Sequence, residues 1–135
     1  MPFLEWKDSY NLGVKEIDNQ HRGLFDIISK LFTSRSYDSD GKYFFLMLNK
    51  FVEYAQVHFT TEERYMQEAQ YPKFAEHRHE HELFIVQVSK LLQDVENKTP
   101  EIEKTTLDFL KDWYLAHIVG TDRDLEYWFK TKGFK

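Results

Sequence analysis

Cysteine is absent from this chain of 135 residues, and proline and glycine are scarce, with three and five residues. Without cysteine the protein has no disulfide, no thiolate metal ligand and no cysteine nucleophile. The scarcity of proline and glycine leaves long uninterrupted stretches, which favours helices. Lysine and arginine number 18 against 23 aspartates and glutamates, and no basic cluster is present. This balance argues against nucleic acid as a partner, because phosphate binding needs clustered basic residues.

Long apolar runs are also missing, so no segment is suited to cross a bilayer. The first residues, MPFLEWKDSY, lack the basic stretch and apolar run of a signal peptide. From these absences we expect a cytoplasmic protein with no membrane insertion. Aromatic residues, by contrast, make up 17% of the chain, which is typical of a packed interior. The length fits one domain, and we predict a single domain over residues 1–135.

Apolar residues at steps of three and four predict four helices, over residues 17–33, 42–68, 72–95 and 100–130. Residues 34–41, SRSYDSDG, are predicted to form a loop. We expect Pro72 in the first turn of the third helix, and Thr99 to cap the fourth helix with Pro100 at its first position. Residues 1–16 are predicted to form an extended arm that docks through Phe3, Leu4, Trp6, Tyr10 and Leu12. The short connections predict an all-α, up-down-up-down four-helix bundle.

Polar residues interrupt the apolar faces of all four predicted helices. Residues four apart lie on one face of a helix, and two such pairs occur in HFTTEE and HRHEH. The segment HIVGTD holds a pair five apart, and one more histidine lies in IDNQH. The inward-facing set is His21, His58, Glu62, His77, His81, His117 and Asp122. His79 is excluded, because it lies about 200° around its helix from its neighbours.

The pair in HIVGTD does not fit an ideal α-helix. Five residues turn such a helix by about 140° beyond a full turn, so His117 and Asp122 converge poorly unless the backbone adjusts. Gly120 lies between them. We therefore predict a π-bulge or a local break near residues 118–121, a feature often found at functional sites.

Burying so many polar groups costs free energy unless they have partners. A network of histidine–carboxylate hydrogen bonds is one alternative, but seven such residues on four core faces favour a metal site. Seven donors are too many for one tetrahedral zinc and suit two metals bridged by Glu62 and Asp122. Imidazole ligands suit iron, zinc, copper or nickel, and the lack of sulfur weakens the case for copper(I). Composition alone leaves manganese and zinc open as alternatives to iron.

The ordered set IDNQH, HFTTEE, HRHEH and HIVGTD resembles the hemerythrin family over nearly the whole chain, including FLEW in the arm. The resemblance implies a non-haem di-iron centre with an oxo or hydroxo bridge. It implies that His77, His81 and His117 hold one iron, that His21 and His58 hold the other, and that Glu62 and Asp122 bridge. It further implies reversible dioxygen binding at the iron held by His21 and His58, for storage or for delivery to an O2-consuming enzyme.

Residues flanking these ligands are candidates for a dry wall around the dioxygen pocket. They are Leu24, Phe25, Phe59, Tyr114 and Ile118. Tyr114 departs from the family pattern, because bacterial relatives commonly carry leucine there. Its phenol adds bulk and a polar group beside the pocket, which puts O2 affinity and autoxidation rate in doubt but leaves the ligand set unchanged.

Other functions stay open at this point. A di-iron oxidase or peroxidase is one alternative, although carboxylate-rich enzymes use Glu-x-x-His repeats and the proposed ligand positions have none. An O2- or iron-responsive sensor module is another, although sensors of this family are usually fused to signalling domains. A metal-free bundle is a third. We expect a monomer that is not an enzyme.

Overall fold

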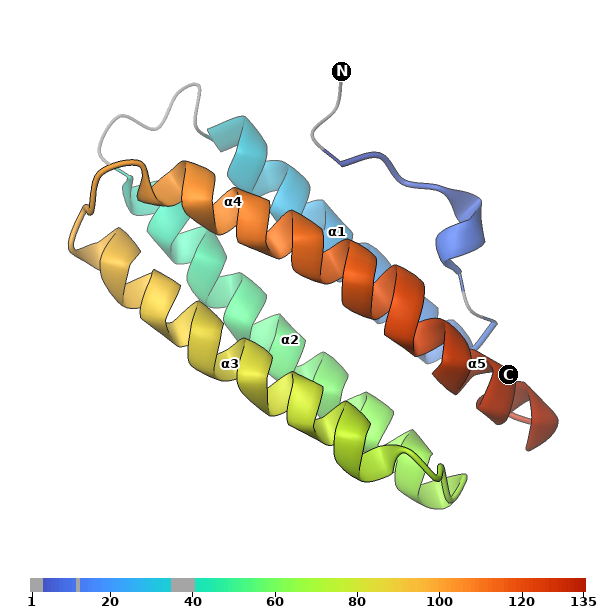
Figure 1. Ribbon diagram of the computed structural model, residues 1–135. Helices are drawn as coiled ribbons and strands as arrows, with labels where there is room; N and C mark the ends of the chain where they lie inside the picture. Colours follow the sequence, from blue (N-terminus) through green and yellow to red (C-terminus); the bar gives the residue numbers. More distant parts are fainter. Residues whose placement is uncertain (1–3, 12, 35–40) are drawn as a thin grey trace.

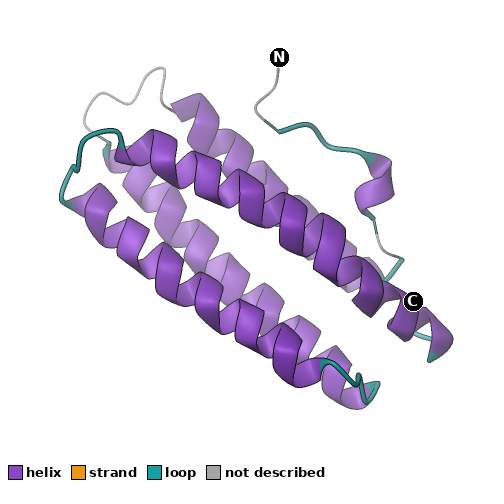
Figure 2. Cartoon of the chain, viewed as in Figure 1, coloured by secondary structure: helices purple, strands orange, loops and turns teal. Residues whose placement is uncertain are grey.

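The computed structural model describes residues 4–11, 13–34 and 41–135, and its helices lie side by side in one bundle (Figure 1). The first three are α1 (Lys15–Ser34), α2 (Lys42–Glu68) and α3 (Phe74–Glu96). The fourth is built from α4 (Ile102–Trp113), the π-helix η2 (Tyr114–Thr121) and α5 (Asp122–Thr131). The described residues contain helices and loops only (Figure 2), so the predicted all-α bundle is confirmed. None of these helices is both long and apolar enough to cross a membrane.

α1 and α3 each contact both α2 and α4, and α2 also contacts α5. The interior contains two apolar clusters, a larger one with Leu24 and Phe84 and a smaller one with Ile17 and Phe129. On α1, Ile17 belongs to the smaller cluster, Leu24 belongs to the larger one, and His21 lies between them. The polar residues of the interior therefore lie between two apolar layers.

α2 and α3 end in the same hydrogen-bond pattern, which begins the connection to the next helix. After α2, the N–H of Tyr71 donates to the carbonyl of Met66 at 2.9 Å, and Gln70 takes a left-handed φ of 54°. After α3, the N–H of Thr99 donates to the carbonyl of Asp94 at 3.0 Å in the same way. This Schellman motif closes a helix end and turns the chain back within a few residues. The tight connections keep neighbouring helices antiparallel.

The observed helix starts differ from the expected ones at three places. α1 begins at Lys15, two residues before the expected start at residue 17. α3 begins at Phe74, two residues after Pro72. α4 begins at Ile102 rather than Pro100, because Lys98 and Glu101 take left-handed φ values and hold the intervening turn out of the helix. No side chain caps the start of α4. Phe3 and Leu12 of the predicted arm, and residues 35–40 of the predicted loop, lie outside the described residues.

The described part of the N-terminal arm lies against the bundle through aromatic side chains. Tyr10 is buried, and the ring of Trp6 meets that of Phe25 edge to face at 5.5 Å. The guanidinium of Arg22 lies 4.5 Å from the centre of the Trp6 ring, a favourable cation–π distance. Tyr10 also contacts the ring of Tyr114 at 6.3 Å. The arm therefore covers the side of α1 that carries His21.

Candidate metal centre

The seven polar residues singled out in the sequence meet in the middle of the bundle. Each helix contributes: one residue from α1, two from α2, two from α3, one from η2 and one from α5. All seven are buried, and the most exposed of them, His117, keeps only 3% of its surface. His79 is exposed, as its position on α3 predicts.

The imidazoles point their Nε2 atoms toward one another. The Nε2 atoms of His21 and His58 are 3.1 Å apart, and those of His81 and His117 are 3.2 Å apart. The Nε2 of His81 also lies 3.1 Å from Oε1 of Glu62. Five rings from four helices thus converge on one buried volume with the same ring atom.

The outer hydrogen bonds show which ring nitrogen of His58 carries its proton. Thr61 donates its hydroxyl to the carbonyl of Val57 at 3.0 Å and accepts a hydrogen bond from Nε2 of Gln20 at 3.0 Å. Oε1 of Gln20 then accepts from Nδ1 of His58 at 2.9 Å. Because the amide oxygen can only accept, Nδ1 of His58 must hold the proton, and its Nε2 presents a lone pair to the interior.

His81 has the same arrangement with a charged partner. Its Nδ1 donates to Oε2 of Glu63 at 2.9 Å, and its Nε2 faces inward, 3.1 Å from Oε1 of Glu62. The sequence analysis missed Gln20 and Glu63 as participants in the site. Glu63 looks like an ordinary surface residue of α2, because its partner lies on α3 and no spacing within α2 indicates that contact.

Several buried polar atoms of the centre have no hydrogen-bond partner among the described residues. They include Oε2 of Glu62, Oδ1 of Asp122 and both ring nitrogens of His77. Nε2 of His77 lies 3.1 Å from Oδ1 of Asp122, yet the two atoms are not aligned for a hydrogen bond. Buried polar groups are almost always paired, so these atoms need a partner that a hydrogen-bond network does not supply. Converging imidazole nitrogens and unpaired carboxylate oxygens suit cations.

The donors divide into two groups that share a carboxylate. In one, Glu62 gathers with His77, His81 and His117, and in the other it gathers with His21, His58 and Asp122, each with one ligand atom per residue within 4.8 Å of the rest. Asp122 also reaches both groups, with Oδ2 at 2.9 Å from His21 and Oδ1 at 3.4 Å from His117. The arrangement offers two adjacent metal positions with nitrogen and oxygen donors, which suits iron, zinc or manganese.

The π-helix places Asp122 in the site. The N–H of Asp122 donates to the carbonyl of His117, five residues earlier, where an α-helix pairs residues four apart. This is the stretch for which the spacing of HIVGTD predicts a bulge or break. Gly120 is not needed for it, because a Cβ there lies in ordinary contact with the Leu115 carbonyl at 3.9 Å. The extra residue per turn brings both side chains to the same side of the helix.

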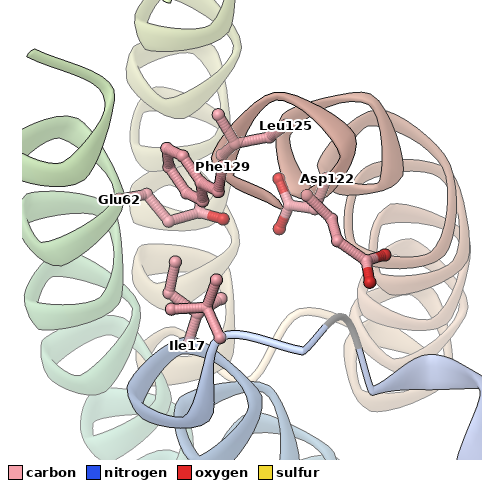
Figure 3. Close-up of a pocket in the computed structure, with 7 residues that line it drawn as sticks. Ile17, Glu62, Asp122, Leu125 and Phe129 are labelled. Carbon is pink, nitrogen blue, oxygen red and sulfur yellow. The ribbon is translucent and has the colours of Figure 1, made fainter. Parts of the chain in front are cut away.

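Apolar side chains close one end of the centre. The carboxylates of Glu62 and Asp122 face a common space that is bordered by Ile17, Leu125 and Phe129 (Figure 3). This space has no room for a water molecule. Apolar walls of this kind exclude solvent from charged groups and strengthen their electrostatic interactions.

Aromatic rings cover the histidines on the other side. Phe59 stacks on His81 with ring centres 3.9 Å apart, and Trp113 stacks on His117 at 5.3 Å. The sequence analysis missed Trp113, although it lies four residues before His117 in the same continuous helix. Two surface grooves reach these histidines, one of about 340 Å³ at His81 and one of about 190 Å³ at His117. The three-histidine group is therefore the one nearest to solvent.

All five candidates for the dry wall are buried: Leu24, Phe25, Phe59, Tyr114 and Ile118. The phenol of Tyr114 donates to the backbone carbonyl of His21 at 3.0 Å. Its ring also meets that of Phe25 at 6.1 Å. Tyr114 thus joins η2 to α1 beside a proposed ligand, while a role in a dioxygen pocket stays a prediction.

The carboxylates control the protonation of the histidines when no metal is bound. Burial lowers the pKa of His21 and of His77, but the nearby carboxylates of Asp122 and Glu62 outweigh it and raise each pKa to about 9. The pKa of His117 rises to about 10 because attraction to Asp122 outweighs burial. The pKa of Glu62 falls well below its usual value, because nearby histidines outweigh burial.

We expect the metal-free protein to lose stability as the pH rises from about 6.5 toward 10. A histidine whose folded-state pKa is raised from 6.5 to about 9 or 10 stabilises the fold fully below pH 6.5 and loses that contribution as it deprotonates. Thermal unfolding followed by circular dichroism with a chelator, at several pH values, measures this trend. Metal-loaded protein is the control, because its ligand nitrogens carry no proton and its unfolding temperature is expected to hold over this range.

Comparisons with known proteins point to one family. The family model described as the hemerythrin HHE cation binding domain matches residues 12–128. A bacteriohemerythrin of Clostridium acetobutylicum is 32% identical over 123 residues, covering 88% of this chain and 95% of the relative. One of Stenotrophomonas maltophilia is 33% identical over 129 residues, covering 91% and 79%. A crystal structure of wild-type hemerythrin superposes with a TM-score of 0.82 at 26% identity, covering 92% and 95%.

Proposed function

Because the chain belongs to the hemerythrin family, we propose that its seven buried donors hold two iron ions and that this centre binds dioxygen reversibly. The observation that carries the proposal is the pair of donor groups that share Glu62. His77, His81 and His117 hold one iron, His21 and His58 hold the other, and Glu62 and Asp122 bridge them. When bound, the iron pair, with its oxo or hydroxo bridge, supplies a coordination position for dioxygen and the electrons that reversible binding needs.

The protein's own residues hold the ligands in place and keep water out. Gln20 and Glu63 orient the rings of His58 and His81 through their Nδ1 atoms. Leu24 and Ile118 are fully buried and belong to the apolar layer beside the ligands. Such a dry setting disfavours the water and protons that promote loss of bound oxygen as peroxide.

We propose storage or delivery of dioxygen as the biological role, with an O2-consuming enzyme as the recipient. The donor set supports binding over catalysis, because it is rich in histidine and lacks the Glu-x-x-His repeats of carboxylate-rich di-iron enzymes. The apolar residues around Glu62 and Asp122 also leave no space for a water molecule to act as a reactant there. We therefore propose that the protein has no catalytic activity. We further propose that it is a cytoplasmic monomer.

Loading with ferrous iron followed by exposure to oxygen tests this proposal. Metal-free protein is expected to take up two ferrous ions per chain under argon, to gain visible absorption bands in air and to lose them when oxygen is removed. Elemental analysis and absorption spectra over repeated cycles measure both properties. Bands that form once and never reverse would support an oxidase, and a chain that takes up no iron would refute the metal centre. Turnover of peroxide with an added reductant would instead favour a peroxidase.

A further inference from the structure

The outer hydrogen-bond partners of the histidines differ in charge between the two halves of the centre. In the three-histidine half, Nδ1 of His81 donates to the carboxylate of Glu63 at 2.9 Å. In the two-histidine half, Nδ1 of His58 donates to the neutral amide of Gln20 at the same distance. Nδ1 of His21 and Nδ1 of His77 have no hydrogen-bond partner among the described residues. Among the hydrogen bonds that the described residues make to these outer ring nitrogens, the one with a charged partner lies in the three-histidine half.

A second carboxylate adds to this difference. Oε2 of Glu80 lies 3.7 Å from Nδ1 of His117. The hydroxyl of Thr121, in the π-helix, donates to the other oxygen of Glu80 at 3.4 Å and so steadies it near the ring. Glu80 is half exposed and its contact is longer, so its effect is weaker than that of Glu63.

Glu63 is held in place from two sides. Its side chain is 27% exposed, and the guanidinium of Arg78 lies 3.9 Å from its other carboxylate oxygen. Glu63, Arg78 and His81 together line the groove of about 340 Å³ between α2 and α3. The carboxylate thus lies between solvent and a buried imidazole, where it can make Nε2 of that ring a stronger electron donor to a metal ion.

We propose that Glu63 and Gln20 are positioning residues that make the two metal positions unequal. Glu63 strengthens the three-histidine position and stabilises the higher oxidation state of its iron, because a carboxylate behind an imidazole increases the electron density on Nε2. Gln20 orients His58 without adding charge. The two-histidine position therefore binds its metal ion less tightly, and its iron is easier to reduce. This inference rests on the proposed metal pair. It assigns a chemical difference to the two halves that the ligand set alone does not specify.

Stepwise metal titration of two variants tests this assignment. Glu63→Gln keeps the size of the side chain and an acceptor for His81 but removes the charge. We expect it to weaken one of the two binding steps for Zn²⁺ by about 10- to 100-fold while the other step changes little. Glu82→Gln is the matched control, because Glu82 lines the same groove, pairs with Arg78 at 3.3 Å and contacts no ligand. It removes the same charge and is expected to leave both steps unchanged.

The reduction potential provides a readout that a structural defect alone does not reproduce. Glu63→Gln is expected to raise the potential of the iron-loaded protein, because loss of the negative charge favours the reduced metal. Gln20→Glu puts a carboxylate behind His58 and is expected to lower it. Shifts of the reduction potential in opposite directions in the two variants support the assignment, provided that both variants keep the circular dichroism spectrum of the wild-type protein.

Failure of this inference is distinguishable from failure of the proposed function. If the wild-type protein binds two metal ions but Glu63→Gln matches Glu82→Gln in both binding steps and in potential, the positioning role is wrong and the metal pair stands. If the wild-type protein does not bind two metal ions, the proposed function itself fails.

Discussion

Glu62→Gln is expected to reduce iron binding from two ions per chain to one ion or none. Glu62 belongs to both donor groups, so its substitution removes an oxygen ligand from each metal position at once. Its carboxylate would also balance the positive charge of the two proposed cations in a site where Glu62 is fully buried. Elemental analysis after anaerobic loading measures the loss, and the visible bands of the oxygenated protein are expected to disappear with it.

The exposed residue Glu53 provides the control for this substitution on the same helix. Glu53→Gln makes the same chemical change away from the centre and is expected to keep two irons. Circular dichroism of the metal-free variants must show intact helices in both. A Glu62→Gln protein that retains two irons and normal oxygenation would show that Glu62 is a hydrogen-bonding residue of the core and not a bridging ligand.

Tyr114→Ala is expected to lower the free energy of unfolding by about 3–5 kcal/mol, the range for truncating a large buried aromatic residue. Tyr114 is fully buried and is the largest of the completely enclosed side chains. Its ring contacts Phe25 and Tyr10, and its hydroxyl holds the backbone of His21. Urea unfolding of the metal-free protein measures the loss without the added stability of bound metal.

Two further tyrosine variants separate packing from hydrogen bonding. Tyr114→Phe removes only the hydroxyl and is expected to cost about 1 kcal/mol. Tyr127→Ala is the surface control, because Tyr127 is 73% exposed, and it is expected to change stability by less than about 0.5 kcal/mol. A Tyr114→Ala protein as stable as the Tyr127→Ala protein would mean that the interior closes over the missing ring at no cost.

The fold was predictable because the helices repeat their apolar residues at regular steps. Phe51, Ala55, His58 and Glu62 follow one face of α2, and all four are buried. The same regularity indicated that the polar residues face inward. It could not give the start of α4, because that boundary depends on the left-handed backbone of Lys98 and Glu101, a conformation that lysine and glutamate rarely adopt.

The surroundings of the site were harder to predict than its donors. Two donors at a fixed spacing on one helix are visible in a sequence, as with His77 and His81. Glu63 takes part through a contact with the ring of His81 on another helix, at 2.9 Å. Such a contact depends on how two helices rotate against each other, and no pattern within one helix reports that rotation.

The additional residue in η2 links the metal centre to the C-terminal end of the bundle through a shared register. Deleting one residue between His117 and Asp122 would leave them four apart, the spacing at which an ordinary α-helix keeps two side chains on one face. If η2 kept all its residues but wound as an ordinary α-helix, the step of five would turn Asp122 out of the centre and would also turn Leu125 and Phe129 away from the smaller apolar cluster. The register that places Asp122, the last proposed ligand, is therefore also the register that packs α5. A change in this helix that moved Asp122 would also displace the apolar side chains of α5.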